Sequence, residues 1–172
     1  MKSIMISIKP EFVQKILNGN KTIEIRKTKP SCELPCKVYI YCTKGKKLYK
    51  CVSNFDEDLL NGKIVAEFIF NKVDTLERDL NDWLPKNRYD ISNELLKNIN
   101  LNQEQLWNYG QGKTLYAWYI DDLKVYDKPK ELSEFSIGKA KIDCGYGNYN
   151  IYNKILKRPP QSWCYVEELE NE

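Results

Sequence analysis

The apolar residues of the first 26 positions follow a strand pattern, then a helix pattern, then a strand pattern again, and this order limits the folds that the chain can adopt. Residues 3–8 form a short apolar run that is typical of a strand. Pro10 then suits the first turn of a helix, where its missing N–H costs nothing. The apolar face of that helix would carry Phe12, Val13, Ile16 and Leu17. Gly19 stands where a left-handed helix end is expected, and residues 22–26 then alternate as a strand. The opening unit is therefore predicted to be strand, short helix, strand.

The rest of the chain mixes strand patterns with one helical stretch. Further strands are predicted at residues 37–42, 62–70, 115–120 and the end of 158–166. The apolar spacing of residues 74–112 instead indicates a helical insertion of three helices, the first beginning at a capping-box pattern over residues 74–77. Residues 138–150 hold three glycines and two asparagines, which is typical of a long loop. We expect an α+β fold: a small mixed β-barrel with a helix between its first two strands, in a single domain over residues 1–172.

The chain contains no histidine among its 172 residues, and this absence narrows the chemistry that it can perform. A Ser-His-Asp triad, a Cys-His pair and every histidine-containing zinc site are excluded. Catalysis would have to use Lys, Asp, Glu, Cys, Tyr, Ser or Thr side chains. The length suffices for one domain with a substantial core.

Positive charge is concentrated at the start of the chain. Residues 1–50 contain 12 Lys or Arg and three acidic residues, a net charge of +9, whereas residues 51–172 carry −6 and the whole chain +3. A basic segment is typical of a surface for phosphate-bearing partners, although the same lysines could form an ordinary solvated surface. The basic turn at Lys44, Lys46 and Lys47 belongs to this segment.

Aromatic residues are the second feature that suits nucleic acid. Twelve Tyr and four Trp could supply stacking surfaces for unpaired bases. Tyr39 and Tyr41 are the better candidates, because on a strand they would face away from Val38 and Ile40. Trp118 is expected in the core instead, since it lies within an apolar strand pattern.

Cysteine and hydropathy patterns bear on metal binding and location. Four of the six cysteines lie close together in the sequence, at Cys32, Cys36, Cys42 and Cys51. Their spacings do not form paired Cys-x-x-Cys ligands, and Cys42 falls on the apolar side of a strand, so a four-thiolate zinc site is the less favoured alternative. We expect no metal and no cofactor.

No segment approaches the ~20 apolar residues of a membrane span and the N-terminus does not resemble a signal peptide, so the sequence predicts a cytoplasmic protein without a membrane partner.

The charged residues at 19–26, Gly-Asn-Lys-Thr-Ile-Glu-Ile-Arg, form the most informative cluster. Glu24 and Arg26 are two apart on a strand and therefore project from the same face. Lys21 directly follows the helix end. If Lys21 were desolvated near Arg26, its pKa would fall and it could act as a base, whereas pairing with Glu24 would keep it charged. The alternative interpretation is a surface ion-pair cluster that contributes little to stability.

This segment resembles the opening of the ASCH domain, a member of the PUA-like superfamily, whose hallmark is Gly-x-Lys-x-x-Glu-x-Arg. Gly19, Lys21, Glu24 and Arg26 match the hallmark, with a helix pattern before the glycine and a strand pattern after it. Later pieces of the domain are similar to residues 38–43, 62–68, 115–121 and 158–166. The resemblance implies a PUA-like β-barrel, a cleft between the barrel and the helix, and an association with RNA.

One branch of the family removes the acetyl group from acetylcytidine by using a Lys, a Thr and a Glu. Lys21, Thr22 and Arg26 match that branch, but Glu24 stands in the place of its catalytic Thr. The branch's catalytic Glu would fall within the insertion at 74–112, where it corresponds to no single residue. Other family members are described as ribonucleases.

Three functions remain open on these grounds. The first is binding of RNA or a nucleotide in a cleft lined by Lys21, Glu24 and Arg26. Further nucleic-acid contacts would come from Lys9, Tyr39, Tyr41, Lys44, Lys46 and Lys47. The second is hydrolysis of a modified nucleoside or of RNA, with Lys21 as base, Glu24 as proton carrier or orienting group and Arg26 as electrostatic clamp. The third is a protein-interaction adaptor that docks through the insertion. The oligomeric state is left open.

Overall fold

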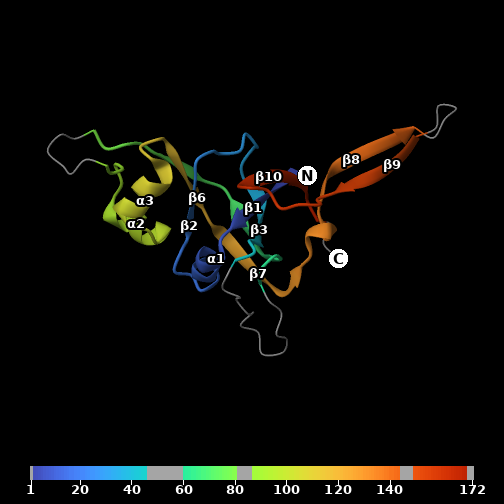
Figure 1. Cartoon of the computed structure of the whole chain (residues 1–172), viewed down its shortest axis with the longest axis horizontal. Coiled ribbons are helices and arrows are strands. Elements are labelled where there is room, and N and C mark those ends of the chain that lie inside the picture. The colour runs from blue at the N-terminus through green and yellow to red at the C-terminus, as the bar shows by residue number, and fades with distance from the viewer. Residues whose placement is uncertain (1, 46–59, 81–86, 144–148, 170–172) are drawn as a thin grey trace.

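The computed structural model describes residues 2–45, 60–80, 87–143 and 149–169, and these form a mixed α+β fold (Figure 1). In chain order the elements are β1 (Lys2–Ile8), α1 (Pro10–Leu17), β2 (Ile23–Arg26), β3 (Cys36–Cys42), β4 (Ile64–Phe70), β5 (Val73–Leu76), α2 (Asn93–Ile99), α3 (Gln103–Gly110), β6 (Leu115–Tyr119), β7 (Asp121–Lys130), the 3-10 helix η1 (Leu132–Glu134), β8 (Ser136–Asp143), β9 (Tyr149–Ile155) and β10 (Trp163–Glu167). None of the described helices is long and apolar enough to cross a membrane.

The opening strand, helix and strand are confirmed by β1, α1 and β2. Pro10 is the first residue of α1, where its missing N–H leaves no hydrogen bond unmade. Gly19 follows the helix end with φ +76°, a backbone conformation that glycine adopts without strain. Its N–H donates to the carbonyl oxygen of Ile16 at 3.0 Å. The chain therefore leaves the helix in a tight reversal that leads directly into β2.

The larger sheet has the strand order β10-β1-β3-β4-β7. β1 and β3 run parallel, with α1 and β2 between them in sequence, and the other neighbours are antiparallel. One face of this sheet packs against α1 and β6, through Ile4 and Ile6 of β1, Val13 and Ile16 of α1, and the fully buried Trp118 of β6. This core fixes the end of β1 beside the start of α1.

The opposite face of the same sheet is covered as well, so the expectation that Tyr39 and Tyr41 are exposed is wrong. Tyr39 is 0% exposed and Tyr41 is 4% exposed. The Tyr39 ring packs edge-on against Phe135 at 4.8 Å between centroids, and its hydroxyl accepts the N–H of Leu169 at 3.0 Å. Alternation along β3 does place these tyrosines opposite Val38, but the chain after η1 returns to cover that face.

The smaller sheet, β2-β6-β5, packs against the helices of the insertion. Its buried side chains include Ile23 and Ile25 of β2, which meet Ile99 of α2 and Leu106 of α3. The second and third predicted helices of the insertion are confirmed by α2 and α3. The α3 helix begins with a reciprocal capping box formed by Asn102 and Gln105.

The first predicted helix of the insertion is wrong where the structure describes it. Residues 73–76 form β5 and pair with β6, and Leu80 is 79% exposed, whereas residues 81–86, including Trp83, lie outside the described residues. The capping-box spacing is a local signal, and pairing with the open edge of β6 satisfies the same backbone groups over four residue pairs.

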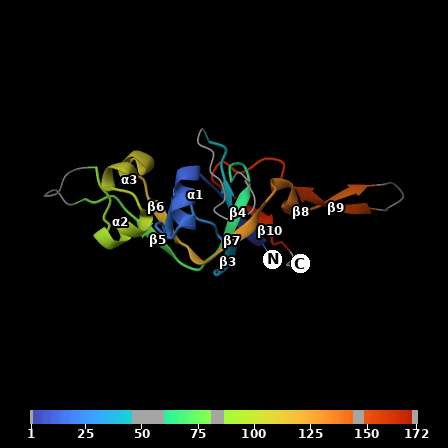
Figure 2. The same ribbon diagram turned by 90° about the horizontal axis from the view of Figure 1, so that it is seen from below.

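Two further expectations are corrected. The glycine-rich stretch at 138–150 is largely a hairpin, because β8 and β9 pair in antiparallel fashion on either side of residues 144–148, which lie outside the described part. The described strands form three separate sheets that are not closed into a barrel. The insertion helices and the β8–β9 hairpin lie at opposite ends of the molecule, with the larger sheet and α1 between them (Figure 1, Figure 2).

Candidate functional site

The hallmark residues are placed by the turn after α1 and by the pairing of β2 with β6. The N–H of Lys21 donates to the carbonyl oxygen of Lys15 at 3.0 Å, which holds the turn against the helix. From there the strand alternates: Ile23 and Ile25 enter the core of the smaller sheet, while Glu24 and Arg26 project from the other face. The prediction that Glu24 and Arg26 share a face is therefore confirmed.

These charged groups are buried, so they do not form a surface cluster. Lys21 is 2% exposed, and Glu24 and Arg26 are each 7% exposed. The Glu24 carboxylate contacts both cations, with Oε2 at 3.3 Å from Lys21 Nζ and Oε1 at 3.1 Å from Arg26 Nη2. Because the carboxylate is shared, the two cations lie beside one acid in a site that water barely reaches.

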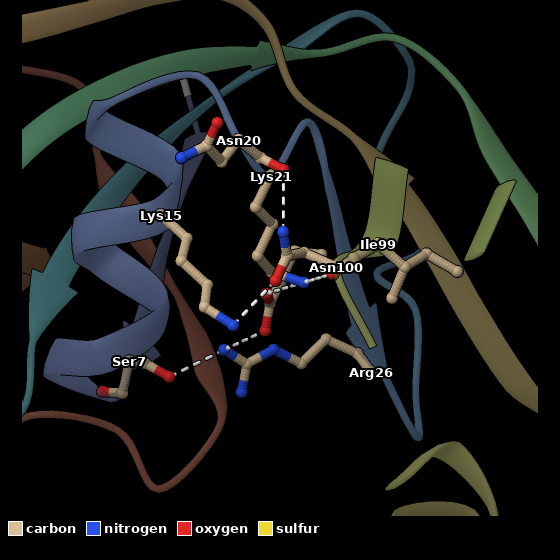
Figure 3. A network of polar contacts seen from close by, with 8 residues as sticks. Ser7, Lys15, Asn20, Lys21, Arg26, Ile99 and Asn100 are labelled. Carbon is tan, nitrogen blue, oxygen red and sulfur yellow. Dashed lines mark hydrogen bonds and ion pairs between the residues drawn. The ribbon is translucent and has the colours of Figure 1, made fainter. Parts of the chain in front are cut away.

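Arg26 ties β2 to the end of β1 and to the segment that precedes β10. Its Nη2 donates to the carbonyl oxygen of Ser7 at 2.7 Å (Figure 3). Its Nη1 reaches Ser162 Oγ at 3.5 Å. Its Nε–H is buried and finds no acceptor among the residues that the structure describes. The guanidinium of Arg26 is therefore fixed by contacts to Glu24, to the end of β1 and to the segment before β10.

Lys21 is held from the side of the insertion. Its Nζ donates to the carbonyl oxygen of Ile99, the last residue of α2, at 2.7 Å. Nearby, Lys15 Nζ donates to Asn100 Oδ1 at 2.7 Å, and Asn100 Nδ2 donates to the carbonyl oxygen of Asn20 at 3.3 Å (Figure 3). These hydrogen bonds therefore connect the end of α2 to α1 and to the turn that carries Lys21.

Burial is the main influence on the ionisation of Lys21. Desolvation lowers the pKa of Lys21 below its ordinary value of 10.5, an effect that the neighbouring Glu24 opposes and that Arg26 and Lys15 reinforce. The Lys21 Nζ also lies 5.6 Å from the centroid of the Phe12 ring. A lysine in such surroundings is closer to losing its proton than a surface lysine, which is the condition that a base requires.

A cleft of about 740 Å³ opens over these residues. That volume suits a ligand of nucleotide size. Its walls come from the end of β1, from α1, from β2, from α3 and from the segment before β10. The lining residues are Ser7, Ile8, Lys9, Phe12, Lys21, Glu24, Ile25, Arg26, Lys27, Thr28, Thr43, Leu101, Gln105, Asn108, Tyr109, Gln161 and Ser162.

One wall was not foreseen from the sequence. Gln105, Asn108 and Tyr109 of α3 reach the cleft, whereas Leu106 of the same helix is buried. Lys27 Nζ lies 5.0 Å from the Tyr109 ring centroid, and partial burial raises the pKa of the Tyr109 hydroxyl, with Arg26 acting against the rise. Helical phase could have marked these three as one face, but nothing in the sequence says that this face meets a turn more than 80 residues away.

The remaining predicted nucleic-acid contacts are spread out. Lys9 lines the cleft and is exposed at its rim. Lys44 is exposed and follows Thr43, which lines the cleft, whereas Lys46 and Lys47 lie outside the described residues. Tyr39 and Tyr41 are in the core and do not reach the cleft.

The cysteines that the structure describes are not among the residues that line the cleft. Cys32 and Cys36 bring their Sγ atoms to 3.2 Å, Cys42 is buried in the core of the larger sheet, and Cys51 lies outside the described residues. Burial raises the pKa of Cys36 to about 12 and that of Cys42 to about 12, so both remain thiols at neutral pH. Within the described ranges, no three His, Cys, Asp or Glu residues gather in a way that could hold a metal ion.

The comparisons with known proteins identify the fold. No family model and no curated protein matches the chain. Solved structures do match: ASCH from Zymomonas mobilis has a TM-score of 0.58 at 18% identity, over 96% of this chain and 88% of that chain. A mutant of the same protein has a TM-score of 0.56 at 18% identity, over 98% of this chain and 92% of that chain. The chain therefore has the fold of these ASCH-domain structures, as the hallmark at Gly19, Lys21, Glu24 and Arg26 predicted.

Proposed function

We propose that the cleft binds RNA or a nucleotide, with Lys21, Glu24 and Arg26 at its floor. The observation that carries the proposal is the buried pair of cations that shares one carboxylate. With Lys21 protonated, the floor holds an excess positive charge that is shielded from water, and a phosphate or a polarised carbonyl is the partner that offsets it. The guanidinium of Arg26 would donate to that partner.

The walls fit the other parts of a nucleotide. Phe12 and Tyr109 offer ring faces on which a base can stack. The side-chain amides of Gln105 and Asn108 carry both donors and acceptors, which suits the edge of a base. Lys9 and Lys27 add positive charge at the rim. These features, together with the ASCH-domain fold, support a nucleic-acid ligand over an apolar one.

Calorimetric titration tests this proposal. Nucleoside monophosphates and a 12-nucleotide RNA would be titrated into the wild type, into Arg26→Gln and into Lys128→Gln, which removes an exposed charge outside the cleft. Arg26→Gln leaves the Lys21–Glu24 pair intact, so the fold should survive. Losing a charge-assisted hydrogen bond of about 1.5–3 kcal/mol should weaken binding at least tenfold. Equal affinities for Arg26→Gln and Lys128→Gln, or no binding by the wild type, would refute the proposal.

Hydrolysis of a modified nucleoside or of RNA is the second candidate. The specific observation in its favour is the lowered pKa of Lys21, whose amine is positioned by Glu24 and by the carbonyl of Ile99. Deprotonated Lys21 would take the proton from water or from a ribose hydroxyl. Glu24 would orient the Lys21 amine, and Arg26 would stabilise the developing negative charge.

A product assay separates the two candidates. The wild type and Lys21→Met would be incubated with acetylcytidine and, separately, with a pool of short RNA, and the products would be resolved by mass. Release of acetate or of cleaved RNA by the wild type alone would support hydrolysis. Intact substrates with both proteins would leave binding as the function, and turnover that survives Lys21→Met would remove Lys21 from the mechanism.

The adaptor hypothesis finds less support among the described residues of the insertion. Its large exposed apolar side chains there are Leu80, at 79%, and Tyr109, at 37%, and Tyr109 already belongs to the cleft. A docking surface for a protein partner would be expected to gather several such side chains into one patch.

A further inference from the structure

The β8–β9 hairpin projects from the larger sheet, at the end of the molecule away from the insertion helices (Figure 1, Figure 2). Its strands pair with each other, and its base rests on β10. Among its side chains, Ile142, Ile151, Tyr152 and Ile155 are each about half exposed, at 52%, 61%, 47% and 50%. Side chains with this exposure contribute little to the core.

The hairpin is also basic. Residues 136–155 carry three Lys and one Asp, a net charge of +2, and Lys157 and Arg158 just after β9 add two more positive charges, in a chain whose total is +3. Lys139 and Lys154 are exposed and make no ion pair with the described part of the chain. A second copy of the chain is a poor partner for this surface, because two-fold pairing of one basic hairpin with another would oppose like charges. A polyanion complements it.

A short basic segment connects the hairpin to the cleft. Lys157 and Arg158 are exposed and follow β9 after Leu156, while Gln161 and Ser162 line the cleft. Ser7 fixes this segment, since its Oγ donates to the carbonyl oxygen of Pro160 at 2.6 Å. Ile155 and Gln161 are six residues apart and so lie within about 21 Å of each other. At about 3.4 Å per nucleotide, roughly six nucleotides of a stacked strand cover that distance.

We propose that the β8–β9 hairpin and the basic segment after it bind the backbone of a single-stranded nucleic acid whose terminal or unpaired nucleotide occupies the cleft. The preferred ligand is thus a polynucleotide of more than about six nucleotides. Lys139, Lys154, Lys157 and Arg158 contact phosphates, and Tyr152 offers a ring for stacking. The length preference rests on the proposed function of the cleft, whereas the backbone contact by the hairpin stands by itself.

The test compares oligonucleotide length and salt dependence in a charge-neutralised variant. Single-stranded RNAs of one, three and 12 nucleotides would be titrated by fluorescence anisotropy into the wild type and into the double variant Lys139→Gln and Lys154→Gln. The matched control is Lys124→Gln with Lys128→Gln, which removes two exposed charges from β7. A 12-base-pair duplex would be run beside the single strands.

We expect the wild type to bind the 12-nucleotide RNA more tightly than the shorter ones. Loss of two phosphate contacts should reduce the slope of log K against log salt concentration by about 1.4. Over the tenfold range from about 1 M to about 0.1 M salt, this difference in slope amounts to about 25-fold in affinity. The control should match the wild type, and the hairpin variant should bind the mononucleotide unchanged. Circular dichroism would verify that both variants are folded.

Each other result has a definite meaning. If the hairpin variant and the control bind the 12-nucleotide RNA alike, or if the duplex binds more tightly than the single strand, the inference is wrong. If the wild type binds the mononucleotide but gains nothing from length, the hairpin inference fails and the proposed function stands. If length and hairpin charge matter but no mononucleotide binds, the hairpin contact stands and the proposed role of the cleft fails.

Discussion

Glu24→Gln is the substitution that most directly tests the buried charge cluster. Glu24 is 7% exposed and its carboxylate contacts Lys21 at 3.3 Å and Arg26 at 3.1 Å. The amide of glutamine occupies nearly the same volume but carries no charge. The variant therefore leaves two neighbouring cations buried without a counter-charge, while the packing around them is preserved.

The expected cost follows from the burial. Removing one partner from a buried ion pair costs about 3–5 kcal/mol, because the remaining charge is left uncompensated in a low dielectric. The lower end, about 3 kcal/mol, applies to a cluster at the floor of an open cleft. For a chain of this length, each kcal/mol shifts the melting temperature by about 2–4 °C, so the expected loss is about 9 °C.

Lys21→Met supplies the matched comparison. It removes the cation whose burial lowers its own pKa and leaves the neutral Glu24–Arg26 pair in place, so a change below about 1.5 kcal/mol is expected. The double variant with Lys21→Met and Glu24→Gln has one unpaired cation instead of two, so it should recover part of the stability that Glu24→Gln alone loses. Glu33→Gln, at an exposed position, should change the stability by less than about 0.5 kcal/mol.

The pH dependence has a definite sign. Glu24 raises the pKa of Lys21, so Glu24→Gln lowers that pKa further below the unfolded value of 10.5. Between the folded and unfolded pKa values the unfolded chain binds more protons, and stability therefore rises with pH. The deficit of Glu24→Gln relative to the double variant with Lys21→Met should shrink from pH 7 to pH 9.5. Urea unfolding measures the loss of stability and its dependence on pH. A deficit no larger than that of Glu33→Gln, or a deficit that does not change with pH, would refute the reasoning.

Three further predictions concern other parts of the molecule. Tyr109→Ala removes a stacking surface of the cleft and should weaken nucleotide binding about tenfold in titration, since stacking contributes about 1–3 kcal/mol per base. Gly110→Ala should cost about 2 kcal/mol in urea unfolding, because a Cβ there would collide with the hydroxyl of Tyr89. Cys36 and Cys42, whose pKa values burial raises to about 12, should resist iodoacetamide at pH 8 until urea unfolds the chain.

The sequence predicted the parts of the fold that depend on local signals. Pro10 begins a helix, Gly19 ends the turn after it, and alternation along β2 puts Glu24 and Arg26 on one face. Each of these features is decided by residues within one or two turns of chain. The same holds for α3, which begins at the cap formed by Asn102.

The errors arose where distant segments decide the outcome. Tyr39 is buried because Phe135, almost 100 residues later, returns to cover its face of the sheet. Asp74 begins no helix because β6 offers a strand partner from 40 residues away. Alternation indicates two faces of a strand but not which of them is covered, and a capping pattern indicates a helix start only when no strand edge competes.

The same limit explains why half of the candidate site could not be predicted from the sequence. The hallmark residues supply a charged floor, but the proton on Lys21 is held by the carbonyl of Ile99, and the facing wall comes from Tyr109. Lys21 is buried because α2 ends against it, and its pKa is low because it is buried. The motif therefore specifies which groups are present, whereas the insertion determines how basic Lys21 is and what can lie above it. Chains that share Gly-x-Lys-x-x-Glu-x-Arg but differ between β5 and β6 would accordingly be expected to differ in ligand and in chemistry.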